Sequence, residues 1–349
     1  MSDIPGRLRT LETTRHRTSF IDAGPDSGPL IFFIHGWPEL GILWRHQLEY
    51  FASAGWHCIA PDMRGYGKSA VPTEVTAYAM REIVHDMAEL HDSLGSGAAV
   101  WVGHDWGSPV VSALAANEAG RCRGVVNICV PYFPRGFGLA ELLPLVDRGI
   151  YPLDRFPLGQ WDYMQFHIDE PERTAREFDA DPAAFLTMAY QSGTPEGLAD
   201  PAFTASIRAN GGWFGDAGRA PHLPRDPAVL SDADFEVLVE AFATNGFRGP
   251  DNWYLNFEAN RALASTAPDA GHLSMPVLMV HGAWDNVCET VNSRLTDPMR
   301  AACSDLTEVV IDAGHWVAQE RPTELNRAIT DWLEATGITS ASPEEVRTR

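Results

Sequence analysis

The sequence predicts an α/β fold: a mostly parallel central sheet flanked by helices, with a helical segment inserted into it. Three observations predict it. Short apolar, β-branched runs alternate with segments of helical periodicity, this pattern occurs in two separate blocks, and strand signals vanish between the blocks. We therefore expect a first core segment over residues 1–134, a helical cap domain (lid) over 135–256 and a second core segment over 257–349.

The first block contains four predicted strands and two helical patterns. The strands are expected at residues 30–34, 58–61, 99–103 and 124–130. One helical pattern is carried by Trp44, Leu48 and Phe51, and the other by Ile83, Met87, Leu90 and Leu94. Apolar side chains at these spacings lie on one face of a helix, so both helices are expected to pack on the sheet.

The middle segment is helical, aromatic and interrupted by Pro and Gly. Its clearest helix begins at Ser231, whose side chain is a good N-cap, and ends at Asn245 and Gly246. The stretch 210–227 is too rich in Gly, Pro and Asp for regular structure, and we expect it to border an active-site entrance. The second block then adds strands at 277–280 and 308–311 and a closing helix that Gly337 stops.

Composition limits the classes of partner. A formal net charge of -21 argues against nucleic acid and anionic membrane as partners, because both need a basic face. No stretch approaches the length of a membrane span, and we expect a cytoplasmic protein. The five cysteines are scattered, without metal-ligand spacing, and are expected to be free thiols with no metal. Oligomeric state is not readable from the sequence, which leaves a homodimer open.

The stretch that carries the chemistry is Gly103-His104-Asp105-Trp106-Gly107. It has the small-x-nucleophile-x-small shape of a nucleophile elbow, follows an apolar strand and opens a helix, as that motif requires. An aspartate stands where a hydrolase usually has serine. A carboxylate is already ionised at neutral pH and can displace a leaving group from saturated carbon.

Two further groups follow in the chain order of a catalytic triad, which is nucleophile, acid and then histidine. Asp285 comes just after the strand at 277–280, and His315 comes just after the strand at 308–311. Both are therefore expected at the carboxyl edge of the sheet beside Asp105, where ligands bind in open α/β sheets.

Backbone N–H groups near the nucleophile complete the predicted site. His35-Gly36-Trp37-Pro38 follows the first strongly apolar strand, so the N–H of Trp37 is expected to form an oxyanion hole with the N–H of Trp106. His35 and His104 are interpreted as histidines that pack the turns, because His315 fills the base position. The stretch 62–69 lacks both phosphate-loop patterns, and its glycines are expected to shape a turn.

These motifs resemble the epoxide hydrolases of the α/β-hydrolase fold, specifically the hydrolase domain of the soluble type, across nearly the whole chain. The stretch 246–254 is similar to the cap motif around the second tyrosine of that family, and Asp162-Tyr163 to the motif around the first. The resemblance implies that Tyr163 and Tyr254 hold the epoxide oxygen. A phenol stays protonated at neutral pH and can protonate an emerging alkoxide.

The resemblance also implies a reaction. Asp105 would form a covalent alkyl ester, which water activated by His315 and Asp285 would hydrolyse to a vicinal diol, as in detoxification. The partners would be a small apolar epoxide and water, with no cofactor and no metal, and the Trp37-Pro38 peptide bond would be cis. The chain departs from the family at Leu255, where arginine is frequent, and at 167–170 after the first tyrosine.

Three alternatives remain open at this stage. A haloalkane dehalogenase shares the aspartate elbow and the histidine, but it lacks the tyrosine pair and commonly has asparagine where this chain has Trp37. A fluoroacetate-type dehalogenase would be expected to have arginine beside the nucleophile. A ligand receptor on the same fold would not need the reactive residues, although fold alone never excludes one.

Overall fold

The computed structural model describes residues 4–95, 97–198 and 200–339, and it is built around one eight-stranded sheet. The strand order is β1-β2-β4-β3-β5-β6-β7-β8. β1 pairs with β2, and β2 with β4, in antiparallel orientation, and the other neighbours are parallel. The strands are β1 (Arg7–Glu12), β2 (Arg17–Ala23), β3 (Leu30–Ile34), β4 (His57–Pro61), β5 (Ala99–His104), β6 (Cys122–Ile128), β7 (Leu273–Gly282) and β8 (Cys303–Ile311).

The predicted strands of both blocks are present, and β3 has the expected bounds. β6 begins and ends two residues earlier than predicted, and β7 and β8 are longer. The sequence analysis places no strand before β3, yet β1 and β2 lie there. Nearly all of β1 is exposed, so it lacks the apolar pattern that indicates a strand.

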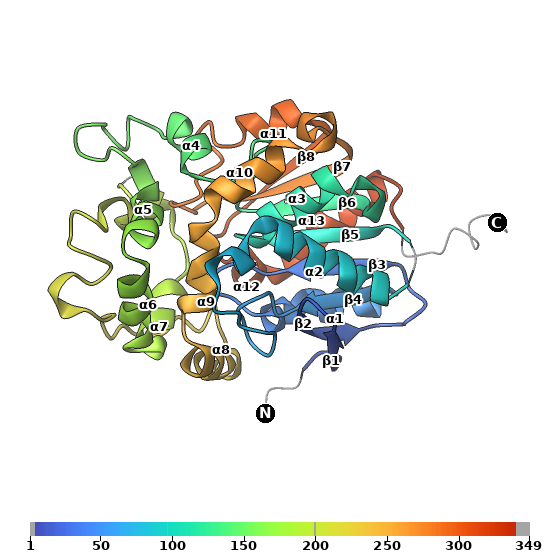
Figure 1. Cartoon of the computed structure of the whole chain (residues 1–349). Coiled ribbons are helices and arrows are strands. Elements are labelled where there is room, and N and C mark those ends of the chain that lie inside the picture. The colour runs from blue at the N-terminus through green and yellow to red at the C-terminus, as the bar shows by residue number, and fades with distance from the viewer. Residues whose placement is uncertain (1–3, 96, 199, 340–349) are drawn as a thin grey trace.

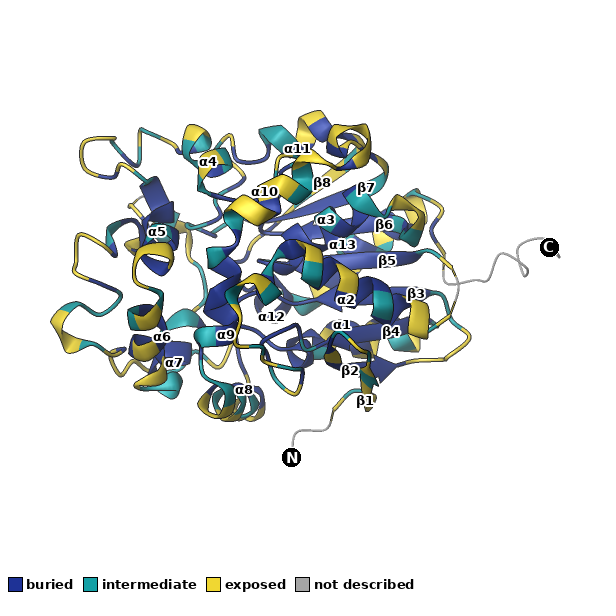
Figure 2. Cartoon of the chain, viewed as in Figure 1, coloured by how far each residue is buried: buried dark blue, intermediate teal, exposed yellow. Residues whose placement is uncertain are grey.

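Helices cover both faces of the sheet. α2 packs on α3 and α10 on one face, and α1 packs on α13 on the other (Figure 1). The strands between these layers are buried, as Figure 2 shows, which explains their continuous apolar runs. The helices are α1 (Arg45–Ser53), α2 (Met80–Ser93), α3 (Gly107–Asn117), α10 (Phe257–Ser265), α11 (Asp297–Ala302), α12 (Val317–Glu320) and α13 (Pro322–Ala335).

Between β6 and β7 the described residues form helices and loops but no strand. This segment lies beside the carboxyl edge of the sheet (Figure 1). Before α10, which packs on α2, the helices of this segment are α4 (Leu139–Leu142), α5 (Asp162–Asp169), α6 (Pro171–Asp179), α7 (Pro182–Ala189), α8 (Asp232–Asn245) and α9 (Arg248–Asp251). In α8 the Ser231 side chain accepts a hydrogen bond from the N–H of Asp234, which confirms the predicted cap.

Short 3₁₀ helices connect these elements. The stretch 210–227 contains a single such turn, η8, and is otherwise irregular, as expected. The 3₁₀ helices are η1 (Gly41–Trp44), η2 (Val75–Tyr78), η3 (Ala119–Arg121), η4 (Leu143–Leu145), η5 (Gly159–Trp161), η6 (Pro195–Leu198), η7 (Phe203–Ser206), η8 (Gly215–Ala217), η9 (Asn252–Leu255) and η10 (Pro268–Gly271).

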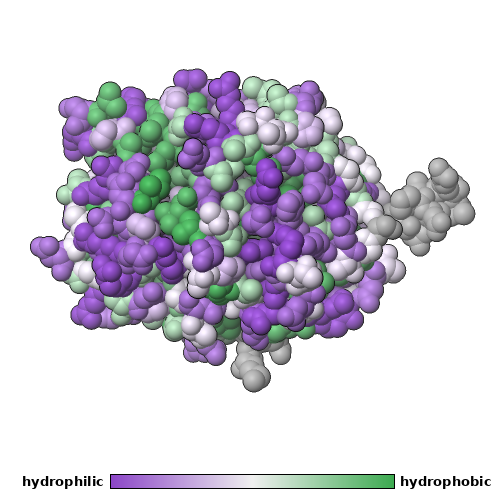
Figure 3. Space-filling model, viewed as in Figure 1, coloured by the Kyte–Doolittle hydropathy of each residue, from purple (hydrophilic) through white to green (hydrophobic). Residues whose placement is uncertain are grey.

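The surface and the thiols agree with the composition. Hydrophilic residues cover most of the face in Figure 3, and hydrophobic ones gather in the half that holds the inserted helices. All five cysteines are buried free thiols, as predicted. Among the described helices, none combines the length and the hydropathy that crossing a bilayer requires.

Candidate active site

Asp105 stands at the sharp turn between β5 and α3. Its φ is +48°, a left-handed conformation that is uncommon for a residue with a β-carbon and is typical of a nucleophile elbow. The turn is tight because the first residue of α3, Gly107, packs directly on the end of β3. A β-carbon at Gly107 would lie 2.0 Å from the carbonyl oxygen of Ile34. The geometry points the Asp105 side chain, 14% exposed, into a cavity of about 360 Å³.

The loops after β7 and β8 bring Asp285 and His315 to this nucleophile. Nε2 of His315 lies 3.6 Å from Oδ2 of Asp105, and its Nδ1 lies 2.7 Å from Oδ2 of Asp285. Oδ1 of Asp285 accepts hydrogen bonds from the N–H groups of Val287 and Cys288, so the acid is held on both oxygens. The imidazole thus stands between two carboxylates in the arrangement of a nucleophile–histidine–acid triad.

The electrostatics of the three groups are coupled. Burial opposes the charged form of His315, but the charge of Asp285 and hydrogen bonds to Asp105 and Asp285 raise its pKa well above the usual value. Burial likewise opposes ionisation of Asp285, yet the charge and hydrogen bond of His315 lower its pKa below the usual value. The carboxylate of Asp285 and the hydrogen bonds of the ring therefore favour the imidazolium form of His315.

The loop after β3 supplies a backbone donor. The N–H of Trp37 donates to Oδ1 of Asp105 at 2.7 Å, and the Trp37-Pro38 peptide bond is cis, as the resemblance implies. Trp106 is the N-cap of α3, so its backbone N–H takes no part in the hydrogen bonds of that helix. Among the described hydrogen bonds, none joins this amide to the Asp105 carboxylate.

Gly36 is where the loop after β3 contacts the turn between β5 and α3. A β-carbon there would lie 2.4 Å from Oδ1 of Asp105 and 2.6 Å from the nitrogen of Trp106. Its φ is one that alanine can adopt, so Gly36→Ala tests steric fit alone. We expect kcat/KM to fall by about 100-fold, because displacing reacting groups by ~1 Å has this cost. Gly120→Ala is the control: a β-carbon there meets no atom within 4 Å, so kcat/KM should be unchanged. A Gly36→Ala variant with the kcat/KM of the wild type would contradict the close contact at Gly36.

The two predicted tyrosines come from different helices and meet in the cavity. Tyr163 lies in α5 and Tyr254 in η9, and both line the cavity with Asp105. Their ring centroids are 5.8 Å apart at an interplanar angle of 75°. Burial, with the negative charge of Asp105 adding to it, raises the pKa of both phenols well above the usual value. Both phenols therefore stay protonated at neutral pH and can donate a proton.

The rest of the cavity lining combines aromatic and polar side chains. The other aromatic residues that line it are Trp37, Phe185, Phe203, Trp213, Trp284 and Trp316, and its polar side chains include Gln191, Ser192, Thr194 and Asn286. Apart from His315, the described residues that line it include no basic side chain.

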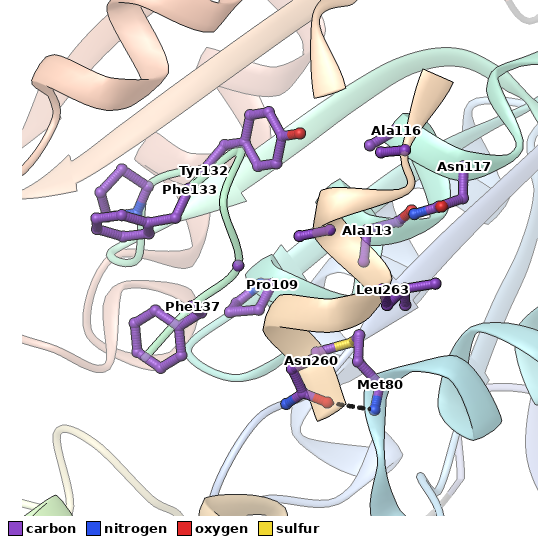
Figure 4. Close-up of a pocket in the computed structure, with 14 residues that line it drawn as sticks. Met80, Pro109, Ala113, Ala116, Asn117, Tyr132, Phe133, Phe137, Asn260 and Leu263 are labelled. Carbon is purple, nitrogen blue, oxygen red and sulfur yellow. Dashed lines mark hydrogen bonds between the residues drawn. The ribbon is translucent and has the colours of Figure 1, made fainter. Parts of the chain in front are cut away.

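A second, smaller cavity of about 40 Å³ lies beside α3 and α10 (Figure 4). Pro109, Ala113, Phe137 and Leu263 are among its mostly apolar lining, and the side chain of Asn260 accepts a hydrogen bond from the Met80 N–H at its edge. It contains none of the predicted site residues and has room for little more than a water molecule.

Sequence reasoning missed one buried charged pair beneath the triad. His104 was interpreted as a turn-packing residue, yet its Nδ1 lies 2.8 Å from Oε1 of Glu39, and its Nε2 2.7 Å from the carbonyl oxygen of His315. Burial opposes the charge of His104, but Glu39 raises its pKa to about 10, so both ring nitrogens donate. Glu39 also accepts from the N–H of Gly36. The available signal was the position of Glu39 directly after Trp37-Pro38, in the loop that is predicted to supply the oxyanion hole.

His35 behaves as predicted, because it accepts a hydrogen bond from the N–H of Met63 and contacts no reacting group. The glycine-rich turn after β4 is likewise structural. Oδ1 of Asp62 accepts from the N–H of Gly41 and Oδ2 from that of Lys68, which closes the turn from within.

The sheet, the elbow and the histidine between two carboxylates define a hydrolase of the α/β-hydrolase class, and the family model for the alpha/beta hydrolase fold matches residues 29–167. Epoxide hydrolase A of Mycobacterium tuberculosis is 33% identical over 93% of this chain and 96% of its own length. The crystal structure of epoxide hydrolase A from Mycobacterium thermoresistibile covers 94% of this chain and 98% of its own, with a TM-score of 0.77 and 31% identity.

A mammalian relative is matched over part of its length. Bifunctional epoxide hydrolase 2 of Sus scrofa is 30% identical over 91% of this chain, which spans 53% of that protein. Taken with the full-length matches, these similarities show that the chain belongs to the epoxide hydrolase family of α/β-hydrolase enzymes.

Proposed function

We propose that this enzyme converts an apolar epoxide and water to a vicinal diol through a covalent ester on Asp105. The observation that carries the proposal is the position of Asp105: one carboxylate faces both His315 Nε2 and the cavity into which two protonated phenols extend. Displacement at saturated carbon needs a carboxylate and an acid. Hydrolysis of the ester needs a base and an oxyanion hole, and the remaining groups supply these.

In the first half-reaction an oxygen of Asp105 forms a bond to an epoxide carbon while the ring C–O bond breaks. The electron pair of that bond goes to the ring oxygen, which takes a proton from Tyr163 or Tyr254. The His315 imidazolium then gives its proton to the phenolate, which restores the phenol and leaves a neutral imidazole. General-acid help of this kind contributes about 10² to 10⁴ in rate.

In the second half-reaction His315 acts as a base. Ester formation removes the carboxylate of Asp105, whose hydrogen bond is one cause of the raised pKa of His315. The pKa of His315 therefore falls, and the neutral imidazole forms more easily. It takes a proton from water, whose oxygen attacks the ester carbonyl. The N–H groups of Trp37 and Trp106 would stabilise the oxyanion, each by about 3 kcal/mol. Collapse releases the diol and restores Asp105 and the imidazolium.

The hydrogen bonding of Trp37 supports epoxide over halide as the leaving group. A dehalogenase needs indole or amide N–H donors aimed at the halide, whereas Nε1 of Trp37 is engaged by Asp251, to which it donates at 3.1 Å. Trp106 is not among the residues that line the cavity. The phenols provide the proton that an epoxide oxygen needs and a halide does not.

A single turnover in ¹⁸O-water tests the covalent route. With enzyme in excess over epoxide, we expect little label in the first diol, because its new oxygen comes from Asp105. Later turnovers should carry label, since water has by then replaced that oxygen. Mass spectrometry of the diol is the measurement, with a haloalkane run in parallel; prompt full labelling of the first diol would rule out the ester.

The remaining expectations form part of the same proposal. The division into core (1–134 and 257–349) and cap (135–256) is supported by the helical composition of the middle segment and by the cavity between it and the sheet. A cytoplasmic location is supported by five buried thiols that form no disulfide. A homodimer stays open.

A further inference from the structure

One helical turn from each tyrosine lies a buried polar side chain that has no part in the reaction described above. His167 is four residues after Tyr163 in α5, and Asp251 is three residues before Tyr254, at the end of α9, which continues into η9. At these spacings side chains share a helix face, so each polar residue faces the same direction as its tyrosine.

The two polar residues meet in the interior. Nδ1 of His167 lies 3.6 Å from Oδ1 of Asp251, and the two side chains are 0% and 1% exposed. Among the residues that the structure describes, none forms a hydrogen bond with either ring nitrogen of His167 or with Oδ2 of Asp251. Leaving buried polar groups unpaired costs about 1–3 kcal/mol each. A small rotation of either side chain would join them in a hydrogen bond.

The protonation states allow that bond. Burial lowers the pKa of His167 to about 3, so its imidazole is neutral at neutral pH. Burial also raises the pKa of Asp251 well above the usual value, which favours the protonated form of its carboxyl. A neutral carboxyl donates through its O–H, and a neutral imidazole has one nitrogen free to accept.

The pair also contacts the rest of the site. The ring centroid of His167 lies 4.4 Å from that of Tyr254, 5.9 Å from that of Tyr163 and 5.7 Å from that of Trp37. Asp251 accepts the indole N–H of Trp37, whose backbone N–H binds the nucleophile. The two residues thus link α5, α9–η9 and the loop after β3.

We propose that His167 and Asp251 are a positioning pair: a buried hydrogen bond between them ties the two tyrosine-bearing helices together and sets the spacing of the two phenols over Asp105. The inference rests on the proposed function, because the phenols matter only if they protonate the leaving oxygen. It predicts that the pair governs ester formation, in which the tyrosines act, and has little influence on ester hydrolysis.

The decisive variant is His167→Phe, which keeps an aromatic ring and removes both nitrogens. Rapid-quench single turnovers, with the alkylated Asp105 peptide quantified by mass spectrometry, separate the two steps. We expect ester formation to slow by about tenfold, since small displacements of acid groups are costly. Ester hydrolysis should change by less than about twofold. His85→Phe, which changes an exposed histidine in α2, is the matched control and should alter neither step.

Asp251 gives the complementary test. Asp251→Leu should slow ester formation as His167→Phe does, whereas Asp251→Asn should restore most of the rate. The amide oxygen can still accept from Trp37, and the amide nitrogen can donate to His167. Circular dichroism and thermal unfolding check that each variant is folded; if Asp251→Leu does not fold, His167→Phe and Asp251→Asn carry the test.

A double-mutant cycle with Tyr254→Phe decides whether the pair acts through the tyrosines. We expect His167→Phe to add little to the loss already caused by Tyr254→Phe, because coupled residues are not additive. The positioning role would be overturned if the rate losses of His167→Phe and Tyr254→Phe multiplied in the double variant, or if His167→Phe slowed ester formation and ester hydrolysis equally. Either result would leave the proposed function standing. A wild-type enzyme that forms no ester would overturn the proposed function and this inference together.

Discussion

Asp105→Ala is expected to lower kcat/KM for an epoxide by about 10⁴-fold or more, because removing the nucleophile of a triad has effects of this size. Two described side chains near it that could in principle act as nucleophiles, those of Ser108 and Cys288, cannot replace it. Ser108 is buried and donates to the carbonyl oxygen of Gly103, and burial raises the pKa of Cys288 well above the usual value, which keeps that thiol protonated. Steady-state kinetics with a neutral aryl epoxide is the measurement.

Two controls make this result interpretable. Asp154→Ala removes an exposed carboxylate from the inserted segment and should leave kcat/KM unchanged. Binding of an unreactive apolar analogue, measured by calorimetry, should survive Asp105→Ala within a few-fold, because the aromatic lining is untouched. Activity within about 100-fold of wild type would instead point to direct attack by water activated by His315 and would refute a covalent ester.

The positions of Asp105, Asp285 and His315 were predictable because each follows a parallel strand within a few residues. The carboxyl ends of parallel strands meet at one edge of the sheet, so a residue just beyond such a strand has its location fixed by the strand. The structure brings the three together with distances of 2.7 and 3.6 Å. Their catalytic roles rest on the chemistry of the groups and on the family.

The tyrosines were accessible by resemblance alone. Tyr163 and Tyr254 lie on helices whose periodicity predicts a helix face but not the other element that the face will meet. The antiparallel strand β1 was missed for a different reason. It is an exposed edge strand, and hydrogen bonds to β2 hold it without the apolar pattern that strand prediction requires.

The buried polar contacts were out of reach for a physical reason. Glu39 meets His104, and His167 meets Asp251, through contacts between segments far apart in the chain. A charged or polar residue in a sequence normally indicates an exposed position. Its burial becomes evident only when the packing that excludes water and the partner that offsets desolvation are both known.

His315→Gln is expected to stop turnover after a single event and to accumulate the alkyl ester on Asp105. Ester formation needs the carboxylate and the phenols, all of which remain, and in this variant solvent water returns the proton to the phenol in place of His315. Ester hydrolysis, by contrast, loses its base. Glutamine retains hydrogen-bonding groups close to Asp285, so the loop after β8 should stay in place. Turnover should fall by about 10⁴-fold or more, in line with the loss of a triad histidine.

Mass spectrometry of the intact protein gives the readout, because each trapped enzyme gains the mass of one substrate molecule. His222→Gln changes an exposed histidine and should turn over normally without a trapped adduct. Adding Asp105→Ala to His315→Gln should abolish the adduct, which assigns it to the nucleophile. Sustained diol formation by His315→Gln would mean that another group activates water, and the imidazole between the two carboxylates would then have to be a structural residue. A trapped ester distinguishes the two half-reactions in one sample, because in His315→Gln the alkylation of Asp105 proceeds without the histidine and the hydrolysis of the ester does not.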